Sequence, residues 1–233
     1  MFSRSARIYD AIYASIRDYP REAADLDRLI QERRPGARTL LDVACGTGAH
    51  LEHVAGRYDV EGLDLEPEML AVARERLPGV TFHEGDMASF DLGKRFDAVV
   101  CMFSSIGYVQ TEERLGSAAA AFARHLEPGG VLVVEPWLGP DVWQDGYVAA
   151  VYVDEPELKI SRMNVARRRG DVSVVDFHYL VATPDGVEHF TELHELGLFT
   201  VQQYLGAFRA AGLEAEHDPT GPMGRGLYIA TAS

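Results

Sequence analysis

The 233-residue chain has little cysteine, few basic side chains and no long apolar run. Two cysteines cannot supply the disulfide framework of a small secreted protein. Because 22 lysine and arginine residues stand against 36 aspartate and glutamate residues, the formal net charge is −14, which repels nucleic acid and anionic membrane surfaces. No segment has the apolar length of a signal peptide or a membrane helix. These absences predict a cytoplasmic protein that binds small molecules and has no nucleic-acid or membrane partner.

Two kinds of catalytic signature are missing as well. Ser104 and Ser105 are not part of a G-x-S-x-G elbow, which argues against a hydrolase nucleophile. His50, His53 and His194 have no cysteine or carboxylate partner at metal-ligand spacing. The same holds for His189, so we expect these four histidines to be surface or structural residues, and we predict no metal site.

What the sequence does contain is a glycine turn between a strand and a helix. Residues 40–50 read LLDVACGTGAH, an apolar run that is broken by Gly46 and Gly48 and followed by helical sequence. A buried parallel strand favours such a run, and glycine lets the backbone approach a ligand closely. The ligand is expected at the carboxyl end of the strand, against the amino terminus of the next helix.

Spacing and charge indicate which cofactor this turn binds. A dinucleotide-binding turn has a third glycine, and Leu51 occupies that position here. Asp42, on the strand itself, can receive the ammonium of an amino-acid-bearing cofactor or hold the glycine loop by hydrogen bonds. The segment resembles the first motif of class I S-adenosylmethionine-dependent methyltransferases. The resemblance implies S-adenosylmethionine as the cofactor, with Asp42, Gly46 and Gly48 around it.

Later segments extend the match at the spacing that this cofactor requires. Asp64 ends the second predicted strand about twenty residues after the glycines, where a carboxylate can accept both ribose hydroxyls. Leu65 is expected to pack on adenine, and Asp86, in the turn after the third strand, to accept a hydrogen bond from the adenine amino group. The fourth strand, 96–101, leads into residues 102–108, the expected floor under the reacting sulfonium.

Strands that alternate with helices in this way predict an α/β fold with a doubly wound, Rossmann-like sheet. We expect seven strands, mostly parallel, with the closing segments 213–217 and 227–230 as an antiparallel edge pair. The helix before them is predicted to begin at Thr200, where Gln203 completes a capping box, and to stop at Gly212.

We predict a single domain over residues 1–233 with two elaborations. Residues 1–36 are expected to form a helical lid, and residues 137–196 an antiparallel β insertion that makes the substrate wall. Within the insertion, the arginine-rich segment 167–171 ends in Gly-Asp and is predicted to be a solvent-exposed hairpin turn. The lid carries three tyrosines that can fold over the cofactor or pack in the core: Tyr9, Tyr13 and Tyr19.

Almost the whole chain resembles the N,N-dimethyltransferases that act on nucleotide-linked 3-amino-deoxysugars in macrolide antibiotic pathways, such as those of desosamine and mycaminose. The segments that carry this resemblance are residues 41–48, 85–87, 102–105, 125–130, 135–137 and 224–227. For the cofactor the resemblance implies contacts from Tyr9, Tyr19, Ala44, Asp64, Asp86, Met87 and Met102.

The acceptor that the resemblance implies is a dTDP-linked amino sugar. It implies four substrate-binding residues: Trp137, Arg162, His178 and Arg225, the last on a phosphate. The chain departs from the family most on this side. Leu138 and Gly139 follow Trp137, where the family has a tryptophan and a phenylalanine.

Methyl transfer from a sulfonium asks for positioning more than for a nucleophilic side chain. A neutral amine displaces the methyl group in line, and near-attack geometry can supply up to ~7–11 kcal/mol. Because the amine must lose a proton, Tyr108 and His178 are candidate catalytic residues, with solvent as a third acceptor. A phenol with a pKa near its reference value of ~10 is protonated at neutral pH, so Tyr108 can instead orient the amine.

Three functions stay open at this point. The first is N-methylation, once or twice, of a nucleotide-linked amino sugar in secondary-metabolite biosynthesis. The second is methylation of nitrogen or oxygen in another small metabolite. The third is cofactor binding without catalysis. The sequence does not decide the sugar, the number of methyl groups, or whether the chain forms a homodimer.

Overall fold

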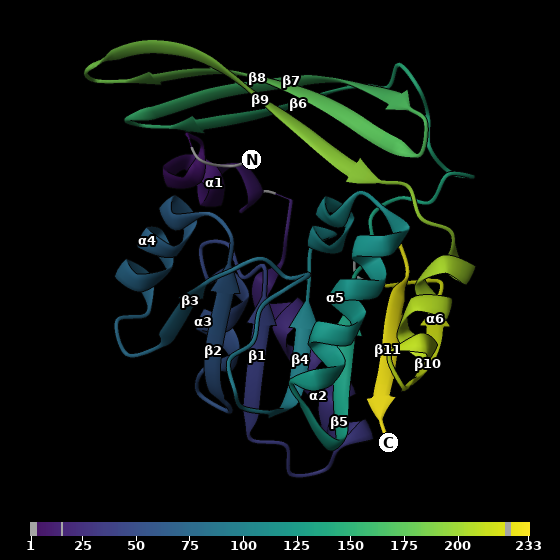
Figure 1. The fold of residues 1–233 in the computed structure, drawn as a ribbon. Coiled ribbons are helices and arrows are strands. Elements are labelled where there is room, and N and C mark those ends of the chain that lie inside the picture. The colour runs from purple at the N-terminus through teal and green to yellow at the C-terminus, as the bar shows by residue number, and fades with distance from the viewer. Residues whose placement is uncertain (1–3, 15, 222–224) are drawn as a thin grey trace.

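The computed structural model describes residues 4–14, 16–221 and 225–233, and it contains two stacked sheets (Figure 1). The larger sheet has seven strands in the order β10-β11-β5-β4-β1-β2-β3, and the smaller has four in the order β6-β7-β8-β9. The predicted α/β fold with a seven-stranded, mostly parallel sheet is confirmed. Residues 1–3 and 222–224, which belong to the predicted lid and flank Arg225, lie outside the described residues.

Five strands of the larger sheet are parallel, and β11 is antiparallel both to β5 and to the edge strand β10. In chain order they are β1 Thr39–Val43, β2 Asp59–Asp64, β3 Thr81–Glu84, β4 Phe96–Cys101, β5 Leu126–Val134, β10 Leu213–Asp218 and β11 Leu227–Ala232. The chain moves from β1 outward to β3 and then returns to place β4 on the other side of β1. The carboxyl ends of β1 and β4 therefore flank a switch point, where open α/β sheets bind ligands.

Helices cover both faces of this sheet (Figure 1). On one face lie α2 Tyr19–Arg33, α3 Ala49–Val54 and α4 Pro67–Arg76, and on the other lie α5 Glu112–Arg124 and α6 Val201–Ala210. The predicted capping box is present, because the Thr200 side chain accepts from Gln203 N while the Gln203 side chain accepts from Thr200 N. Among the described residues, no helix is long and apolar enough to cross a membrane.

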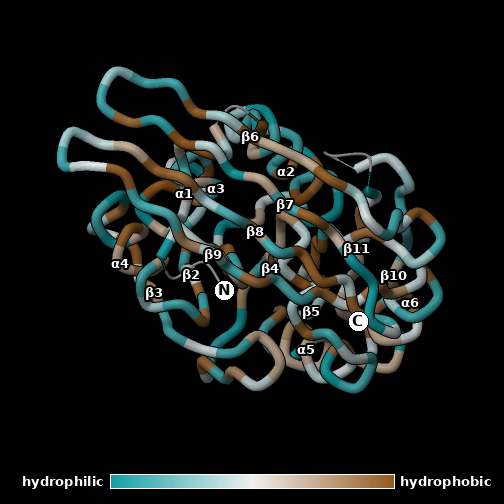
Figure 2. Tube along the Cα trace, turned by 90° about the horizontal axis from the view of Figure 1, so that it is seen from above, coloured by the Kyte–Doolittle hydropathy of each residue, from teal (hydrophilic) through white to brown (hydrophobic). Residues whose placement is uncertain are grey.

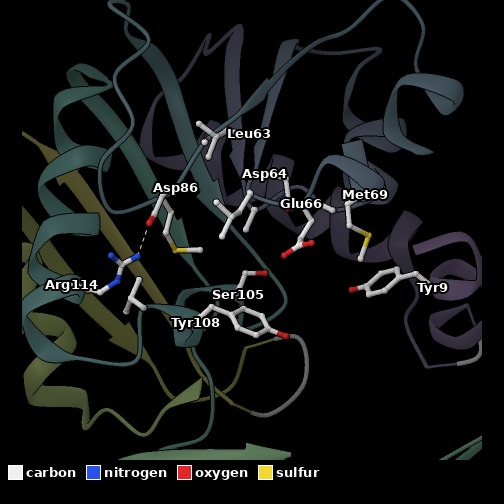
Figure 3. A pocket seen from close by; sticks show the side chains of 15 residues that line it. Tyr9, Leu63, Asp64, Glu66, Met69, Asp86, Ser105, Tyr108 and Arg114 are labelled. Carbon is white, nitrogen blue, oxygen red and sulfur yellow. Dashed lines mark hydrogen bonds and ion pairs between the residues drawn. The ribbon is translucent and has the colours of Figure 1, made fainter. Parts of the chain in front are cut away.

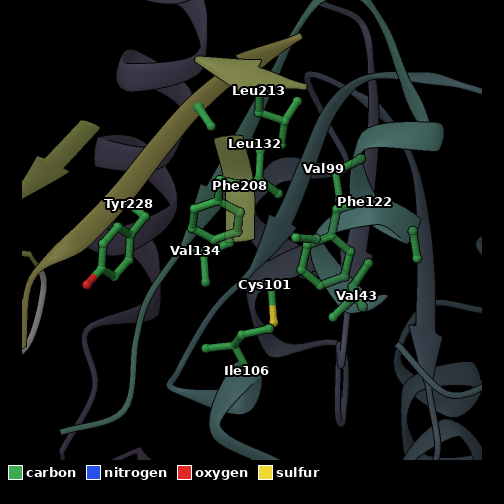
Figure 4. Close-up of a cluster of buried hydrophobic side chains, with 14 of the residues drawn as sticks. Val43, Val99, Cys101, Ile106, Phe122, Leu132, Val134, Phe208, Leu213 and Tyr228 are labelled. Atoms are coloured by element: carbon green, nitrogen blue, oxygen red, sulfur yellow. The ribbon is translucent and has the colours of Figure 1, made fainter. Parts of the chain in front are cut away.

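The core on the α5–α6 face is built from aromatic and branched side chains (Figure 4). Phe122 and Phe208 are fully buried against Val99 and Leu132 of the strands. Burial of each such side chain contributes about 1.5–3 kcal/mol relative to exposure. This packing gives the strand ends above it a rigid base.

The smaller sheet lies across the carboxyl ends of the parallel strands (Figure 1). Its strands are β6 Val148–Glu155, β7 Leu158–Arg169, β8 Val172–Thr183 and β9 Gly186–Gly197, each antiparallel to the next. Buried and exposed side chains alternate, so one face turns toward the larger sheet. The hairpin turn predicted within 167–171 is present at residues 170–171, where Gly170 has a φ of +60°, and residues 167–169 are the end of β7.

The first helix, α1 Ala6–Tyr13, lies between the two sheets. Its Ile12 packs with Tyr179 and Phe190 of the smaller sheet. Its Asp10 accepts a hydrogen bond from Thr47 Oγ1 of the glycine turn at 2.7 Å and pairs with Arg76 of α4. Thus α1 has the position of a lid, whereas α2 packs against the parallel sheet as part of its core.

Candidate functional site

Two adjoining pockets open at the carboxyl ends of the parallel strands. The first follows β1, β2 and β3 and extends in two directions from Ala44 and Gly46 (Figure 3). One arm is lined by predicted cofactor residues Tyr9, Asp64, Leu65, Asp86 and Met87. The other arm is lined by predicted cofactor residues Tyr19, Asp42 and Met102. The structure therefore brings predicted cofactor residues together in one elongated space. They come from α1, from α2, from β1 and its turn, and from the carboxyl ends of β2, β3 and β4.

The glycine turn forms the floor of this space. Ala44, Gly46 and Gly48 have φ values of +59°, +56° and +73°. A Cβ on Gly46 would meet no protein atom within 4 Å, so it would project into the space left for a ligand. A Cβ on Gly48 would lie 3.4 Å from Ala73 Cβ, so this glycine serves the start of α3 and its packing, and it does not line the pocket.

Two buried carboxyl groups lie under the turn. Asp64 accepts hydrogen bonds from Gly46 N at 2.8 Å and from Glu66 N at 2.9 Å. Burial and the neighbouring Asp64 raise the pKa of Asp42 to about 8. The structure gives Asp42 no ion pair with a described residue. A ligand that brings positive charge to this place would relieve the repulsion between the two groups.

The arm beside Asp42 contains an unsatisfied donor. The Tyr19 hydroxyl is buried and has no hydrogen-bond partner among the described residues. Burial raises the pKa of this phenol above its usual value, so it remains a donor. A buried hydroxyl without a partner costs free energy, and a ligand oxygen would remove that cost. An α-amino acid, with an ammonium for Asp42 and a carboxylate for Tyr19, fits this arm.

The opposite arm suits an adenosine. Met69, Met87 and Leu65 supply apolar surface there. Asp86, which was expected to accept from the adenine amino group, lines this arm, and its Oδ2 accepts from Arg114 Nη2 at 2.7 Å (Figure 3). Burial opposes ionisation of Asp86, but Arg114 and the amide of Ala88 together hold its pKa below the usual value. The two arms together match the two ends of S-adenosylmethionine.

The second pocket lies between the first and the smaller sheet. Tyr9, Ser105 and Tyr108 line both pockets, so the two meet at these side chains (Figure 3). Ser105 and Tyr108 belong to a short 3₁₀ helix, η1 Ser105–Val109, which follows β4 after a bend at residues 102–104. Any group passed from one ligand to the other must cross this junction.

The floor of the second pocket is a strained bend after β4. Phe103 and Ser104 have φ values of +54° and +64°, which non-glycine residues adopt at a cost of about 1 kcal/mol or more each. Buried Glu135 holds the bend by accepting from Phe103 N at 2.8 Å and from both terminal nitrogens of Arg17 at 3.2 Å. The guanidinium carbon of Arg17 also lies 4.3 Å from the centre of the Phe103 ring.

Two guanidinium groups face the second pocket, that of buried Arg162 and that of half-buried Arg225. Arg162 donates to the Tyr13 hydroxyl at 2.9 Å, and its Nε is buried without a partner among the described residues. Arg225 donates to Ser104 Oγ at 2.9 Å and lies over the ring of Trp137 at 4.9 Å. In the described ranges neither arginine has an ion pair with a carboxylate. Burial lowers the pKa of Arg225, yet a guanidinium stays charged at neutral pH.

Known proteins share this arrangement. A family model described as a methyltransferase domain matches residues 40–130. The dTDP-3-amino-3,4,6-trideoxy-alpha-D-glucopyranose N,N-dimethyltransferase of Streptomyces venezuelae is 48% identical over 227 residues, which cover 96% of this chain and 96% of that protein. The chain belongs to the family of dTDP-amino-sugar N,N-dimethyltransferases.

Solved structures agree with this family membership. The crystal structure of Streptomyces venezuelae DesVI matches the methyltransferase with a TM-score of 0.94 and 47% identity, covering 98% of both chains. CalS10, an amino pentose methyltransferase from Micromonospora echinaspora that was solved with S-adenosylmethionine bound, matches with a TM-score of 0.89 and 44% identity, covering 97% of both chains. The cofactor of the methyltransferase is S-adenosylmethionine, and the amino-acid and adenosine arms fit it.

One predicted site residue lies elsewhere in the methyltransferase. His178 is on the face of the smaller sheet that turns away from the pockets, where it stacks on His189 and half of its side chain is exposed. The reason is strand alternation: its neighbour Phe177 points into the second pocket, so His178 must point out. The geometry therefore gives His178 no contact with either ligand within one chain.

Several residues of the site had no signal in the sequence. Phe177, Asn164 and His194, the last of which was expected to be a surface or structural residue, line the second pocket, and Arg114 lines the first. Arg114 is part of an ordinary amphipathic helix, and the others lie in strands whose facing cannot be assigned before the sheet is placed. Within the described residues no cluster of His, Cys, Asp and Glu is arranged to hold a metal ion.

Proposed function

We propose that this methyltransferase transfers methyl groups from S-adenosylmethionine to the exocyclic amine of a dTDP-linked amino sugar, and that it does so twice. One observation carries the proposal: the second pocket, which meets the cofactor pocket at Tyr9, Ser105 and Tyr108, holds one buried and one half-buried arginine, and neither has a carboxylate partner among the described residues. Such a pocket calls for an anionic ligand.

A diphosphate fits the charge of the pocket. Each guanidinium can donate two parallel hydrogen bonds to a phosphate, which is the geometry that distinguishes arginine from lysine. Glu135, a carboxylate that acts electrostatically on Arg225, is already paired with Arg17. The positive charges of Arg162 and Arg225 are thus available to a ligand.

The walls of the pocket suit a sugar and a base. Trp137 is fixed in position because its indole N–H donates to Ser173 Oγ at 2.8 Å. Trp143, Phe177 and Tyr147 add aromatic surface, on which sugar and base faces pack well. Leu138 also lines this pocket, at the position where the family has a second tryptophan, and we infer that it selects the sugar.

The chain's own residues act on the reaction by placement. S-adenosylmethionine supplies an electrophilic methyl group at the junction of the two pockets. Tyr9, Ser105 and Tyr108 present polar groups there that can fix the acceptor amine. The strained bend at Phe103 and Ser104 holds η1 in position, which is the preorganisation that in-line transfer needs.

The proposal is tested by turnover of methyl-labelled S-adenosylmethionine with a panel of acceptors. The panel contains dTDP-3-amino and dTDP-4-amino sugars, the same sugars without nucleotide, and dTDP-sugars that carry hydroxyl in place of the amine. We expect two methyl groups on a dTDP-amino sugar by mass spectrometry and no product from the other two groups. Turnover of the free amino sugar at the same efficiency would contradict the role of the diphosphate, and methylation of the hydroxyl sugar would contradict the amine.

We propose in addition that the enzyme is a homodimer through the outer face of its smaller sheet. Seen from above, the strands of the smaller sheet carry hydrophobic residues interspersed with hydrophilic ones (Figure 2). In a chain with a net charge of −14, the side chains of Val148, Met163, Leu180 and Leu193 are each at least half exposed on this outer face. Exposed apolar patches of this kind mark interaction sites, and a two-fold axis would cover the same patch on both copies.

The test is the molar mass of the protein in solution by light scattering after size exclusion. We expect a dimer for the wild type, a monomer for Leu193→Glu, and a dimer for the control Val201→Glu, whose side chain lies on α6 away from this face. A monomeric wild type at micromolar concentration would contradict the proposal.

A further inference from the structure

A row of three polar side chains leads away from the junction of the two pockets. The Tyr108 hydroxyl lies 2.7 Å from Nδ1 of His194, a residue of β9 that is 1% exposed. Nε2 of the same imidazole lies 3.8 Å from Oε2 of buried Glu192, two residues earlier on the strand. A phenol, an imidazole and a carboxylate therefore follow one another from the reaction centre into the protein.

The carboxylate at the inner end of this row is firmly held. Glu192 accepts hydrogen bonds from Ser5 Oγ at 2.6 Å, from Ser5 N at 3.1 Å and from Arg4 N at 3.0 Å. These donors lie at the amino terminus of α1, which favours negative charge. Burial opposes ionisation, but His194 and Ser5 hold the pKa of Glu192 below its usual range, so Glu192 is an anion at neutral pH.

The protonation state of the imidazole follows from its surroundings. Burial lowers the pKa of His194 more than Glu192 raises it, so the ring is neutral at neutral pH. We assign its one proton to Nε2, beside the carboxylate, which leaves Nδ1 as an acceptor. Burial raises the pKa of Tyr108, which is thus a neutral phenol that donates its proton to Nδ1. The lone pairs of the phenol oxygen remain for a ligand at the junction.

His194 is also chemically distinct in its pocket. Among the described residues that line the second pocket there is no aspartate or glutamate, and His194 is the one histidine. The other titratable groups there are arginines, which cannot accept a proton, and phenols, which accept one poorly. An amine that must lose a proton in this pocket has one neutral base within reach, and it reaches that base through Tyr108.

We propose that Tyr108 and His194 form a proton relay for the acceptor amine, and that Glu192 stabilises the imidazolium that results. The inference rests on the proposed function, since it needs an amine acceptor. As the nitrogen–carbon bond forms, the sulfur–carbon bond of the donor breaks and its electron pair stays on sulfur. The N–H proton of the new ammonium passes to the Tyr108 oxygen while the phenol proton passes to Nδ1.

This exchange leaves a methylated neutral amine, a neutral phenol and a protonated His194, so charge and protons balance. The reverse passage returns the proton to water when the pocket opens. A second methyl transfer requires the nitrogen lone pair again, and the relay restores it without release of the singly methylated sugar. The enzyme thereby couples proton removal to dimethylation within one pocket.

The matched variants are His194→Asn, Tyr108→Phe and the double variant. An asparagine can place its amide oxygen near the position of Nδ1, so it keeps an acceptor for the phenol but takes no proton. The control is His53→Asn, an exposed histidine on α3. The readout is the single-turnover rate of methyl transfer from pH 6 to 9.5, with S-adenosylhomocysteine affinity measured alongside.

At pH 7 we expect the His194→Asn and Tyr108→Phe rates to fall roughly 10²-fold, the scale of general base catalysis, with unchanged S-adenosylhomocysteine affinity. The double variant should lose no more than either single variant, because the two groups act in series. The loss should shrink toward pH 9.5, where hydroxide can take the proton of the new ammonium without the relay. A rate within twofold of wild type at pH 7, or an equal loss at every pH, would overturn the relay.

Several charged or titratable groups surround the imidazole of His194 and can affect the pH profile. These groups are Tyr108 of η1, Glu192 of β9 and Arg162 of β7, with Tyr13 and Tyr179 beside the phenol. Burial holds the pKa of Tyr108 and of Tyr179 above the usual value of a phenol, so His194 and the substrate amine are the groups expected to change.

A second measurement separates the relay from the proposed function. If wild type fails to methylate any dTDP-amino sugar, the proposed function fails, and nitrogen chemical shifts of His194 in the S-adenosylhomocysteine complex still decide the relay. We expect a neutral ring that is protonated at Nε2, with an Nδ1 shift that moves in Tyr108→Phe. A proton on Nδ1 at neutral pH would overturn the proposal.

Discussion

The cofactor half and the acceptor half of the site differ in how far apart their partners lie in the chain. In the cofactor half, Gly46 bonds to Asp64 across 18 residues, and Asp86 bonds to Arg114 across 28. In the acceptor half, the partners of the corresponding hydrogen bonds are 149, 121 and 86 residues apart: Tyr13 with Arg162, Ser104 with Arg225, and Tyr108 with His194.

This difference explains how methyltransferases can keep the cofactor half of the site while the acceptor half varies. The cofactor groups sit at the ends of adjacent parallel strands, so each strand and the turn after it place one group. The acceptor groups come from α1, η1, the smaller sheet and the segment before β11, which meet only in the folded chain. A change in the smaller sheet can therefore alter the acceptor without touching the cofactor. The following predictions test that separation.

The largest effect is expected from Gly46→Ala. The new Cβ would enter the cofactor space at a φ of +56°, so we expect S-adenosylhomocysteine affinity to fall at least about 100-fold, or roughly 3 kcal/mol, by calorimetry. Gly36→Ala is the control, because Gly36 also has a positive φ, +84°, with no atom within 4 Å of the new Cβ. Binding of dTDP should be unchanged in both. Equal losses of cofactor affinity would show that backbone strain alone is responsible.

A second test removes a positive charge from the acceptor half of the site. In Arg225→Met we expect the KM for the dTDP-amino sugar to rise roughly 10- to 100-fold, as expected for loss of a charged hydrogen bond worth about 1.5–3 kcal/mol. Steady-state kinetics measures this change, and S-adenosylhomocysteine affinity should stay within twofold of wild type. The control is Arg28→Met on the exposed side of α2. Weaker cofactor binding in Arg225→Met would break the separation of the two halves.

The third test measures how cofactor affinity depends on pH. The pKa of Asp42 is about 8 in the free protein, so a cationic ligand must displace a proton at lower pH. We expect S-adenosylhomocysteine affinity to rise about tenfold per pH unit from pH 6 to 8 and then level off. Asp42→Asn should abolish this slope and bind about tenfold more weakly at pH 8.5. A wild-type affinity that does not vary with pH would contradict the assignment of Asp42 to the ammonium.

The raised pKa of Asp42 also predicts how the stability of the free protein depends on pH. Its pKa in the folded protein lies above the ordinary aspartate value of about 3.9, so its favourable contribution is complete below that value and is lost as the pH rises through about 8. Asp42→Asn should therefore raise the free energy of unfolding of the free protein at pH 8.5 by at least about 1 kcal/mol, which thermal unfolding detects as a higher Tm. The gain should vanish near pH 4.

The smallest effect is expected where the two halves touch through α1. Asp10→Asn weakens the contacts with Thr47 and Arg76 that hold this helix over the cofactor. Because the ion pair is partly exposed, we expect only about threefold faster release of S-adenosylhomocysteine in stopped-flow measurements. Asp25→Asn on α2 serves as the control, since its partner Arg28 is exposed. An unchanged release rate would show that α1 is not a lid for the cofactor.

The parallel strands, the start of α6 and the turn between β7 and β8 were predictable because each is encoded by a short local pattern. The run around Asp42, the capping box at Thr200 and the turn at Gly170 all follow from neighbouring residues. Gly48 shows the limit of such patterns. The motif places it beside the cofactor, whereas the packing of α3 on α4 uses it to let Ala73 approach.

The smaller sheet shows a different limit. Its strands were recognisable, but one residue of register decides whether a side chain faces the pocket or the outside. Phe177 and His178 are adjacent, and the sheet turns the first inward and the second outward. His194 had no sequence signal at all, because its partners Tyr108 and Glu192 become visible only when β9 passes over η1.

By itself the sequence determined the cofactor class and the parallel sheet, because those depend on glycine spacing, apolar runs and acids at strand ends. The tertiary structure decided which side chains surround the acceptor amine. That choice depends on how the antiparallel sheet and α1 pack over the strand ends, and contacts between segments more than eighty residues apart leave no local pattern in the chain.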